Sequence, residues 1–323
     1  MSEFAFGLVV VLAWFAAVNL AASALVSALA RSLRRGTFRL RMATGATGLL
    51  ALKLFPGAVS LFFVLGLLLP AQWRFEPKGA EESAGICLIV LAAVGGLTLA
   101  LAVRRATRDT CLTTSLERAW LHRASTPGRL RGVDLPVYRL PDAAPIIALV
   151  GLRKPRLYVA QPVLDAFTAE ELEACLSHEL AHRDTRDNLK RVLVACSPDL
   201  LALWRSGRRL EQWWRAAVEF AADARAVQGD EERAVCLASA LLKVVRLAPV
   251  GPPLSVGFSD GTLLWARIDR LLGPAAEPAA ARALPAAWSL GLAAAVLCGA
   301  ALAAEGTWLT VHAVTEGLIR FLP

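Results

Sequence analysis

The chain has 323 residues, of which 56% are hydrophobic, and its mean hydropathy is +0.51. This apolar content is higher than an average soluble domain carries, so it argues against a soluble enzyme and favours a membrane protein. The formal net charge of +8 comes mainly from arginines that flank apolar stretches, which indicates membrane topology and attraction to anionic lipid rather than direct nucleic-acid binding.

Four stretches carry no charged residue over a length that can cross the hydrocarbon core, which takes about 20 apolar residues in a helix. They are residues 4–30, 54–73, 83–103 and 283–304. The second stretch can also begin earlier, near Ala43, with Lys53 inside its cytoplasmic end. We do not expect a cleaved signal peptide, because Ser2-Glu3 supplies no positive region before the first apolar run. The pattern predicts a mainly α, polytopic membrane protein with four transmembrane helices.

The loops between these stretches differ in charge. Between the first and second apolar stretches the charged residues are all basic: Arg31, Arg34, Arg35, Arg39, Arg41 and Lys53. The next loop is mixed, and Arg104, Arg105 and Arg108 follow the third stretch. Because cytoplasmic loops are rich in Lys and Arg, we predict a protein of the inner membrane with its amino terminus outside. Residues 1–104 would form a membrane domain with three helices, 105–282 a cytoplasmic domain, and 283–323 the fourth helix with a short extracytoplasmic tail.

The predicted cytoplasmic domain mixes helices with short β-rich runs. In the region from 107 to about 132 the spacing of apolar residues predicts a helix that ends before Pro127-Gly128. The runs 137–140, 146–150 and 156–160 predict a small sheet or hairpin, which would be either structural or an edge that binds an extended substrate. Thr168 and Glu171 form a capping box, so a helix should begin there and continue through the sequence HELAH at 178–182.

His178 and His182 lie one turn apart on that helix, about 40° from each other around its axis. Two imidazoles placed in this way can bind one Zn²⁺, and Glu179 beside them can accept a proton from the water that the metal activates. A catalytic zinc also needs a third ligand. The sequence EFAADARAV, in a predicted helix from 208 to 228, offers Glu219 as that ligand and Asp223 to hold the N–H of a zinc-bound histidine.

Three further sets of residues have open roles. Asp184 and Asp187 follow the HELAH motif, and either one can brace the site or merely solvate the helix end. Three residues are candidates for a donor that stabilises an oxyanion: Tyr138, Tyr158 and Arg225. Trp204, Trp213 and Trp214, with the apolar stretch 192–203, suggest a surface against the bilayer with Arg205, Arg208 and Arg209 at headgroup level, or else ordinary core.

These motifs, in this order, resemble the membrane zinc metallopeptidases of the beta-lactam-sensing antirepressors (BlaR/MecR type). The resemblance covers the apolar spans and, most specifically, GLRKPRLYVAQPVLDAFTAEELEACLSHELAHRDTRDNLKRVL followed by VEFAADARAV. It implies a cytoplasmic, gluzincin-like α+β zinc-peptidase domain between the third and fourth spans. In that family His178, His182 and Glu219 would be the zinc ligands, Glu179 the catalytic base, and Asp223 the carboxylate behind a histidine.

The chain departs from the sensor-bearing members of that family after its fourth span. Only 19 residues follow Ala304, and none of the five lysines has a serine three positions before it, so an S-x-x-K penicillin-sensor domain is not expected. The predicted function is a zinc endopeptidase that cuts a cytoplasmic or membrane-proximal protein, with a transcriptional repressor as the substrate that the family suggests. The alternatives are a membrane quality-control protease of the HtpX kind and a non-proteolytic zinc-containing signalling scaffold. The lipid bilayer is the other expected partner, and a homodimer is left open.

Overall fold

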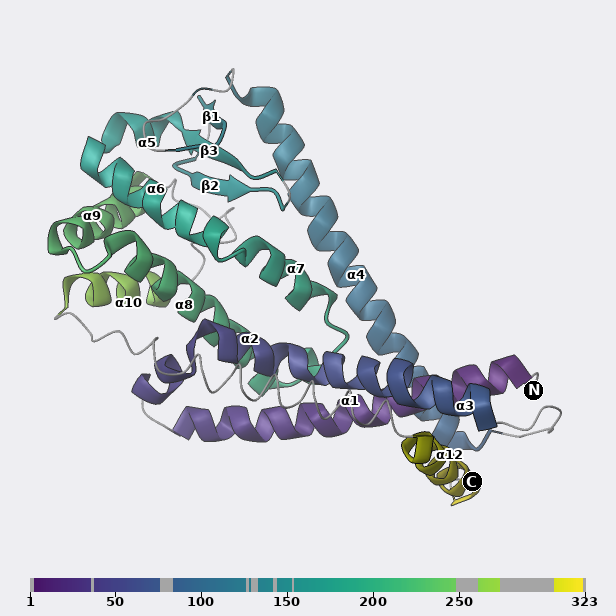
Figure 1. Cartoon of the computed structure of the whole chain (residues 1–323). Helices are drawn as coiled ribbons and strands as arrows, with labels where there is room; N and C mark the ends of the chain where they lie inside the picture. The colour runs from purple at the N-terminus through teal and green to yellow at the C-terminus, as the bar shows by residue number, and fades with distance from the viewer. Residues whose placement is uncertain are drawn as a thin grey trace. The chain divides into compact units, whose positions relative to one another are not determined.

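The computed structural model describes residues 3–35, 38–75, 84–125, 128, 133–141, 144–152, 154–247, 261–273 and 305–321. The described part is mostly helical, and three of its helices are long and apolar enough to cross a membrane (Figure 1). The chain divides into two compact units. The first combines Met1–Ala106, Leu193–Trp213 and Ala279–Pro323, and the second combines Thr107–Val192 and Trp214–Pro278.

The first unit contains the long apolar helices. Its elements are α1 (Glu3–Arg35), α2 (Phe38–Phe62), the π-helical turn η1 (Phe63–Leu68), α3 (Leu69–Phe75), the first part of α4 (Ile86–Arg123) and α12 (Glu305–Phe321). The membrane-length segments are Phe4–Ser32, Gly45–Phe75 and Ile86–Arg123, which cover the first three predicted spans. The fourth predicted span, 283–304, lies outside the described residues. The sequence therefore located three apolar helices correctly.

A segment that the sequence assigned to the 105–282 domain packs with these apolar helices instead. It is Leu193–Trp213, which includes the short 3-10 helix η2 (Leu200–Leu203). Asn19 of α1 holds it from both sides, since its Nδ2 donates to the Pro198 carbonyl oxygen at 2.8 Å and its Oδ1 accepts from the Leu200 N–H at 3.1 Å. Buried polar backbone groups need such partners, so Asn19 allows an irregular segment to lie against apolar helices.

The start of α8 (Arg205–Val227) differs from the prediction. The sequence placed the helix after Gly207, but the helix begins at Arg205 and includes that glycine. A Cβ atom at position 207 would collide with the Leu201 carbonyl oxygen, so Gly207 permits close packing rather than ending a helix. The other end agrees with the prediction, because α8 stops at Val227 and Gly229 follows with a positive φ of 82°.

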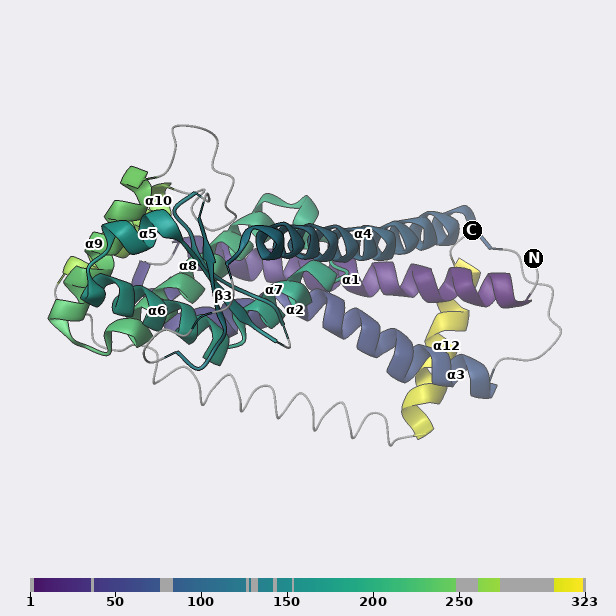
Figure 2. The ribbon, with the colours of Figure 1, turned by 90° about the horizontal axis from the view of Figure 1, so that it is seen from above.

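The second unit is built around a three-stranded sheet with the order β1-β3-β2. Strand β1 (Val137–Leu140) is parallel to β3 (Arg156–Ala160), and β2 (Ile147–Val150) is antiparallel to β3, which confirms the predicted small sheet. Figure 2 shows β3 between α6 and the second half of α4. The helix predicted from residue 107 is this second half, which continues from the third span without a break and ends at Arg123, before Pro127-Gly128 as expected.

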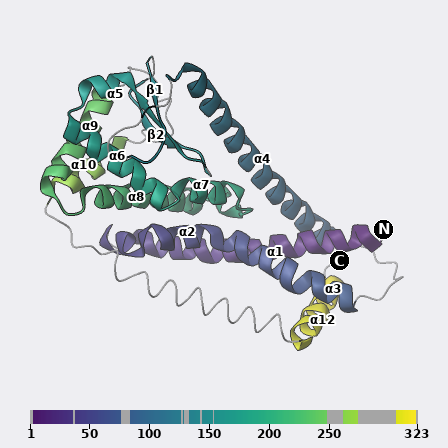
Figure 3. The ribbon, with the colours of Figure 1, turned by 45° about the horizontal axis from the view of Figure 1, so that its top comes forward.

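Helices cover one face of the sheet and form the rest of the core (Figure 3). They are α5 (Gln161–Ala166), α6 (Ala169–Asp184), the first part of α7 (Asp187–Cys196), the second part of α8, α9 (Glu231–Leu247) and α10 (Gly261–Leu272). Leu176 of α6 packs with Leu157 and Val159 of β3, while Cys175 packs with Leu237 of α9. Helix α6 is therefore fixed on two sides, between the sheet and the helical cluster.

The amino-terminal end of α6 is anchored as the sequence predicted. Thr168 Oγ1 accepts from the Glu171 N–H, and the Glu171 carboxylate accepts from the Thr168 N–H, so the capping box is confirmed. The same carboxylate also accepts hydrogen bonds from Ser239 at 2.7 Å and Lys243 at 2.6 Å, both on α9. Glu171 therefore both caps the start of α6 and links α6 to α9 through hydrogen bonds.

Candidate metal centre

Three side chains that the sequence selected as ligands converge in the second unit. His178 and His182 come from α6 and Glu219 comes from α8. The two Nε2 atoms are 3.1 Å apart, and Glu219 Oε2 lies 3.5 Å from that of His178 and 3.8 Å from that of His182. One ligand atom from each residue lies within 4.8 Å of the others. The group could hold a metal ion.

These separations fit the chemistry of zinc. Ligand atoms at zinc distances of about 2.0–2.1 Å in a tetrahedral arrangement are separated by about 3.3–3.4 Å. The observed 3.1, 3.5 and 3.8 Å are near that value, so a small closure of Glu219 would complete a three-ligand set. Two imidazoles and one carboxylate are also the donor set of several catalytic zinc sites that keep a fourth position open.

Carboxylates behind the two histidines orient their rings. His182 Nδ1 lies 2.9 Å from Asp187 Oδ2, and His178 Nδ1 lies 2.9 Å from Asp223 Oδ1, although the second contact is poorly aligned for a hydrogen bond. With each Nδ1 facing a carboxylate, each Nε2 is left to face Glu219. Such a carboxylate fixes the tautomer of a metal-binding histidine and raises its basicity.

The structure decides between the two aspartates that follow the motif. Asp187 is buried at the start of α7 and also accepts from Thr185 at 2.6 Å and Lys190 at 2.8 Å. Asp184 is exposed and pairs with its neighbour Arg183. The turn between α6 and α7, in which Arg186 has a positive φ of 55°, brings Asp187 back toward His182. Asp187 braces the site, and Asp184 does not contact it.

One residue of the site was not selected from the sequence. Arg267 of α10 is only 6% exposed; its guanidinium donates to both oxygens of Asp223, at 2.6 and 2.8 Å, and its Nη1 lies 3.2 Å from Glu219. A signal for it does exist in the sequence. Arg267 lies in an apolar stripe with Leu264, Ile268 and Leu271, and an arginine in such a stripe needs a buried carboxylate as partner.

The electrostatics of the cluster favour charged carboxylates facing positive groups. Burial lowers the pKa of His182, but Asp187 and Glu219 outweigh it and raise this pKa to about 9. Burial would raise the pKa of Glu219, yet the two histidines and Arg267 hold it well below its ordinary value. A divalent cation bound to these side chains would take the place of protons on the imidazoles, as metal binding to histidine requires.

Glu179 lies beside the ligand set without belonging to it. It follows His178 directly on α6, and its Oε2 accepts from the backbone N–H of Leu149 in β2 at 3.1 Å. The carboxylate therefore faces the edge strand of the sheet rather than the two histidines. This is the place that a base needs if it is to act on a molecule lying between that strand and the metal ligands.

The three predicted oxyanion donors lie elsewhere. Tyr138 and Tyr158 stack on each other at 5.3 Å, and Tyr158 also contacts Trp120 of α4. Because side chains alternate between the faces of a strand, Tyr158 points away from the face on which Leu157 and Val159 pack against α6. Arg225 is exposed and lies two residues after the buried Asp223, on the opposite side of α8. The fold does not bring any of the three to the metal ligands.

Comparisons with protein-family models, with curated proteins and with solved structures found no match to this chain.

Proposed function

We propose that this chain is an integral membrane zinc endopeptidase. One observation carries the proposal: ligand atoms from α6 and α8 converge at near-zinc spacing, and a carboxylate that is not needed as a ligand lies beside them. A purely structural zinc site is closed by protein ligands and has no use for a neighbouring free carboxylate, whereas a hydrolytic site needs both an open position and a base.

Each side chain of the cluster then has a defined task. His178, His182 and Glu219 would hold the ion, and a zinc ion held there would supply a Lewis acid that polarises a peptide carbonyl and acidifies water. Glu179 would accept a proton from the attacking water and deliver it to the leaving amine. Asp187 and Asp223 keep the imidazoles in place, and Arg267 positions Asp223 and Glu219.

The sheet offers a way to bind the substrate. Among the described residues, β2 pairs with β3 on one side only, and its other edge faces α6. On that edge the N–H of Leu149 donates to Glu179 and its carbonyl oxygen accepts from Asn188 of α7 at 3.1 Å. An extended peptide that added to the edge would take the place of these two side chains and would pass beside the base. Main-chain pairing of this kind gives affinity with little dependence on side-chain sequence.

The setting of the reaction follows from the apolar helices and the family resemblance. Three helices long and apolar enough to cross a membrane support a membrane protein, and the loop charges favour a catalytic unit on the cytoplasmic side. We therefore propose a cytoplasmic or membrane-proximal protein as substrate. The resemblance to the antirepressor peptidases suggests a transcriptional repressor, with activation by a partner or by lipid.

The test compares Glu179→Gln with the full chain purified in detergent. We expect the variant to keep its zinc and to lose cleavage of a labelled peptide library by at least ~100-fold, the scale of general acid–base catalysis. Glu173→Gln is the matched control, because Glu173 is on the same helix but exposed, and Arg233 is its only ion-pair partner among the residues that the structure describes. The control should retain both zinc and cleavage.

Other outcomes separate the alternatives. Zinc in a chain that cleaves nothing, with and without the substitution, would point to the signalling scaffold. Undiminished cleavage by Glu179→Gln would refute the mechanism. Accumulation of many damaged membrane proteins in cells lacking the chain, without change in any repressor, would favour the quality-control protease.

A further inference from the structure

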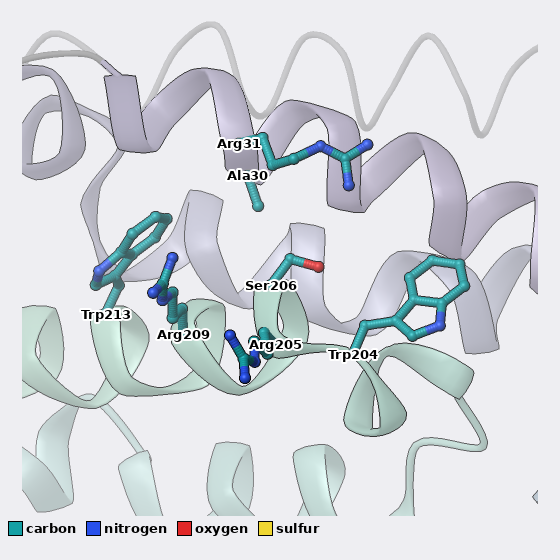
Figure 4. Close-up of a pocket in the computed structure, with 7 residues that line it drawn as sticks. All are labelled: Ala30, Arg31, Trp204, Arg205, Ser206, Arg209 and Trp213. Atoms are coloured by element: carbon teal, nitrogen blue, oxygen red, sulfur yellow. The ribbon is translucent and has the colours of Figure 1, made fainter.

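The first unit contains a pocket with a basic and aromatic lining (Figure 4). It has a volume of about 370 Å³ and lies between the end of α1 and the start of α8. Arg31 projects from α1, and Arg205 and Arg209 project from α8 on the other side of the space. Trp204 and Trp213 stand at its two ends. None of these residues takes part in the metal cluster.

The charge of the pocket is not neutralised within the described residues. No acidic side chain lines it, and Arg31, Arg205 and Arg209 form no ion pair with any described residue. Arg205 and Arg209 are one turn apart on α8, where like charges repel each other. Three guanidinium groups around one space are the arrangement that binds phosphate, since each presents a fork of N–H donors that matches two phosphate oxygens.

The backbone adds to this positive potential. Trp204 precedes the first residue of α8, so the pocket includes the amino-terminal end of a 23-residue helix. The first N–H groups of a helix have no acceptor within it, and its dipole makes this end attractive to anions. Ser206 Oγ donates to Ser27 Oγ of α1 at 2.8 Å, which fixes the start of α8 against α1.

The position of the pocket along the membrane-length helix indicates which kind of phosphate group it would bind. Arg31 lies in the last turn of the apolar segment Phe4–Ser32, where a spanning helix leaves the hydrocarbon core and enters the headgroup layer. Tryptophan prefers the same layer, and Trp204 and Trp213 are both half-buried there. We propose that this pocket binds the phosphate of an anionic phospholipid headgroup, with the tryptophans contacting the glycerol and upper acyl region. The proposal does not depend on proteolytic activity.

The test measures lipid binding to the full chain in maltoside micelles. Native mass spectrometry would follow titration with phosphatidylglycerol or phosphatidylcholine. We expect preferential binding of phosphatidylglycerol by the natural chain and a loss of about 25-fold in Arg205→Gln/Arg209→Gln, since each basic side chain near an anionic surface contributes a factor of about 5. Arg208→Gln is the control, because Arg208 is exposed on the same helix but does not line the pocket.

Two results would overturn the proposal. The first is an equal preference for phosphatidylglycerol in the natural chain, the double variant and the control, which would mean that the pocket does not select the lipid. The second is displacement of phosphatidylglycerol by an equimolar amount of inorganic phosphate, which would identify a soluble phosphate as the preferred occupant. Circular dichroism and zinc content of the double variant, unchanged from the natural chain, show that a loss of binding is not a loss of fold.

Discussion

Asp187 and Arg267 lie outside the HELAH and EFAAD motifs, yet both contact residues of the candidate metal site. The spacing of His178 and His182 was enough to select them as candidate ligands, because a helix fixes which residues share a face, and Glu219 was selected because such a site needs a third ligand. Spacing could not choose between Asp184 and Asp187, since the choice depends on a turn with a positive φ at Arg186. It could not reveal Arg267 as a partner of Asp223, because the two residues are 44 positions apart on different helices.

At this scale we predict that Asp187→Asn weakens zinc binding. Removing the carboxylate behind a histidine ligand typically costs about 10–100-fold in metal affinity, because the ring loses its fixed tautomer and part of its basicity. Competition with a chromophoric chelator measures the affinity directly. Asp184→Asn should bind zinc as the natural chain does, since Asp184 is exposed and pairs only with Arg183 among the described residues. Equal weakening in both variants would count against the assigned role of Asp187.

At the scale of elements, α6 is the helix on which the site depends. Its start is fixed by the capping box and by the bonds from Ser239 and Lys243 to Glu171. Burial would raise the pKa of Glu171, but the bonds from Lys243, Ser239 and Thr168 outweigh it and lower the pKa below its ordinary value of 4.5. The carboxylate therefore stabilises the fold fully above pH 4.5, and this contribution is lost as the pH falls through the lowered pKa.

We predict that Glu171→Gln lowers the free energy of unfolding of the metal-free chain by about 1.5–3 kcal/mol at neutral pH, the range for hydrogen bonds to a charged group. The difference from the natural chain should shrink below pH 4.5, where the natural carboxylate becomes protonated. Denaturant titrations in detergent at several pH values measure both effects. Glu173→Gln should change little at any pH, because its partner Arg233 is a surface residue. A difference independent of pH would mean that the charge of Glu171 is not what stabilises the helix.

At the scale of the whole molecule, each unit contains its own buried charged cluster. The second unit has the candidate metal centre, and the first has Lys53 and Asp199, whose Nζ and Oδ1 are 3.2 Å apart with side chains 1% and 0% exposed. Lys53 lies within the membrane-length segment Gly45–Phe75, so its charge needs a partner in an apolar setting. Asp199 supplies it from Leu193–Trp213, which explains why this segment packs with the apolar helices.

We predict that Lys53→Met destabilises the first unit by about 3–5 kcal/mol, because it leaves a buried carboxylate without its partner. The double variant Lys53→Met/Asp199→Leu should lose less than the sum of the two single variants, since both charges are then removed. Denaturation in mixed micelles measures the three values. Lys154→Met serves as control, because Lys154 is exposed. Additive losses would show that the two charges do not stabilise each other.

The sequence by itself determined whatever depends on local periodicity. Apolar runs predicted three membrane-length helices, β-rich runs predicted the three strands, and the spacing within HELAH and within EFAAD predicted which side chains share a face of each helix, because a helix or strand fixes which neighbours face together. The approach of Glu219 to the two histidines depended on the packing of two helices that are distant in the sequence. Only the tertiary structure decided what depends on segments distant in the chain. The tertiary structure places Asp187, and not Asp184, against His182, and it places Arg267 against Asp223. It also places Tyr138 and Tyr158 away from the candidate metal ligands and packs Leu193–Trp213 with the apolar helices. The physical reason is that buried charges take the partner that the fold places beside them, and no local pattern encodes that choice.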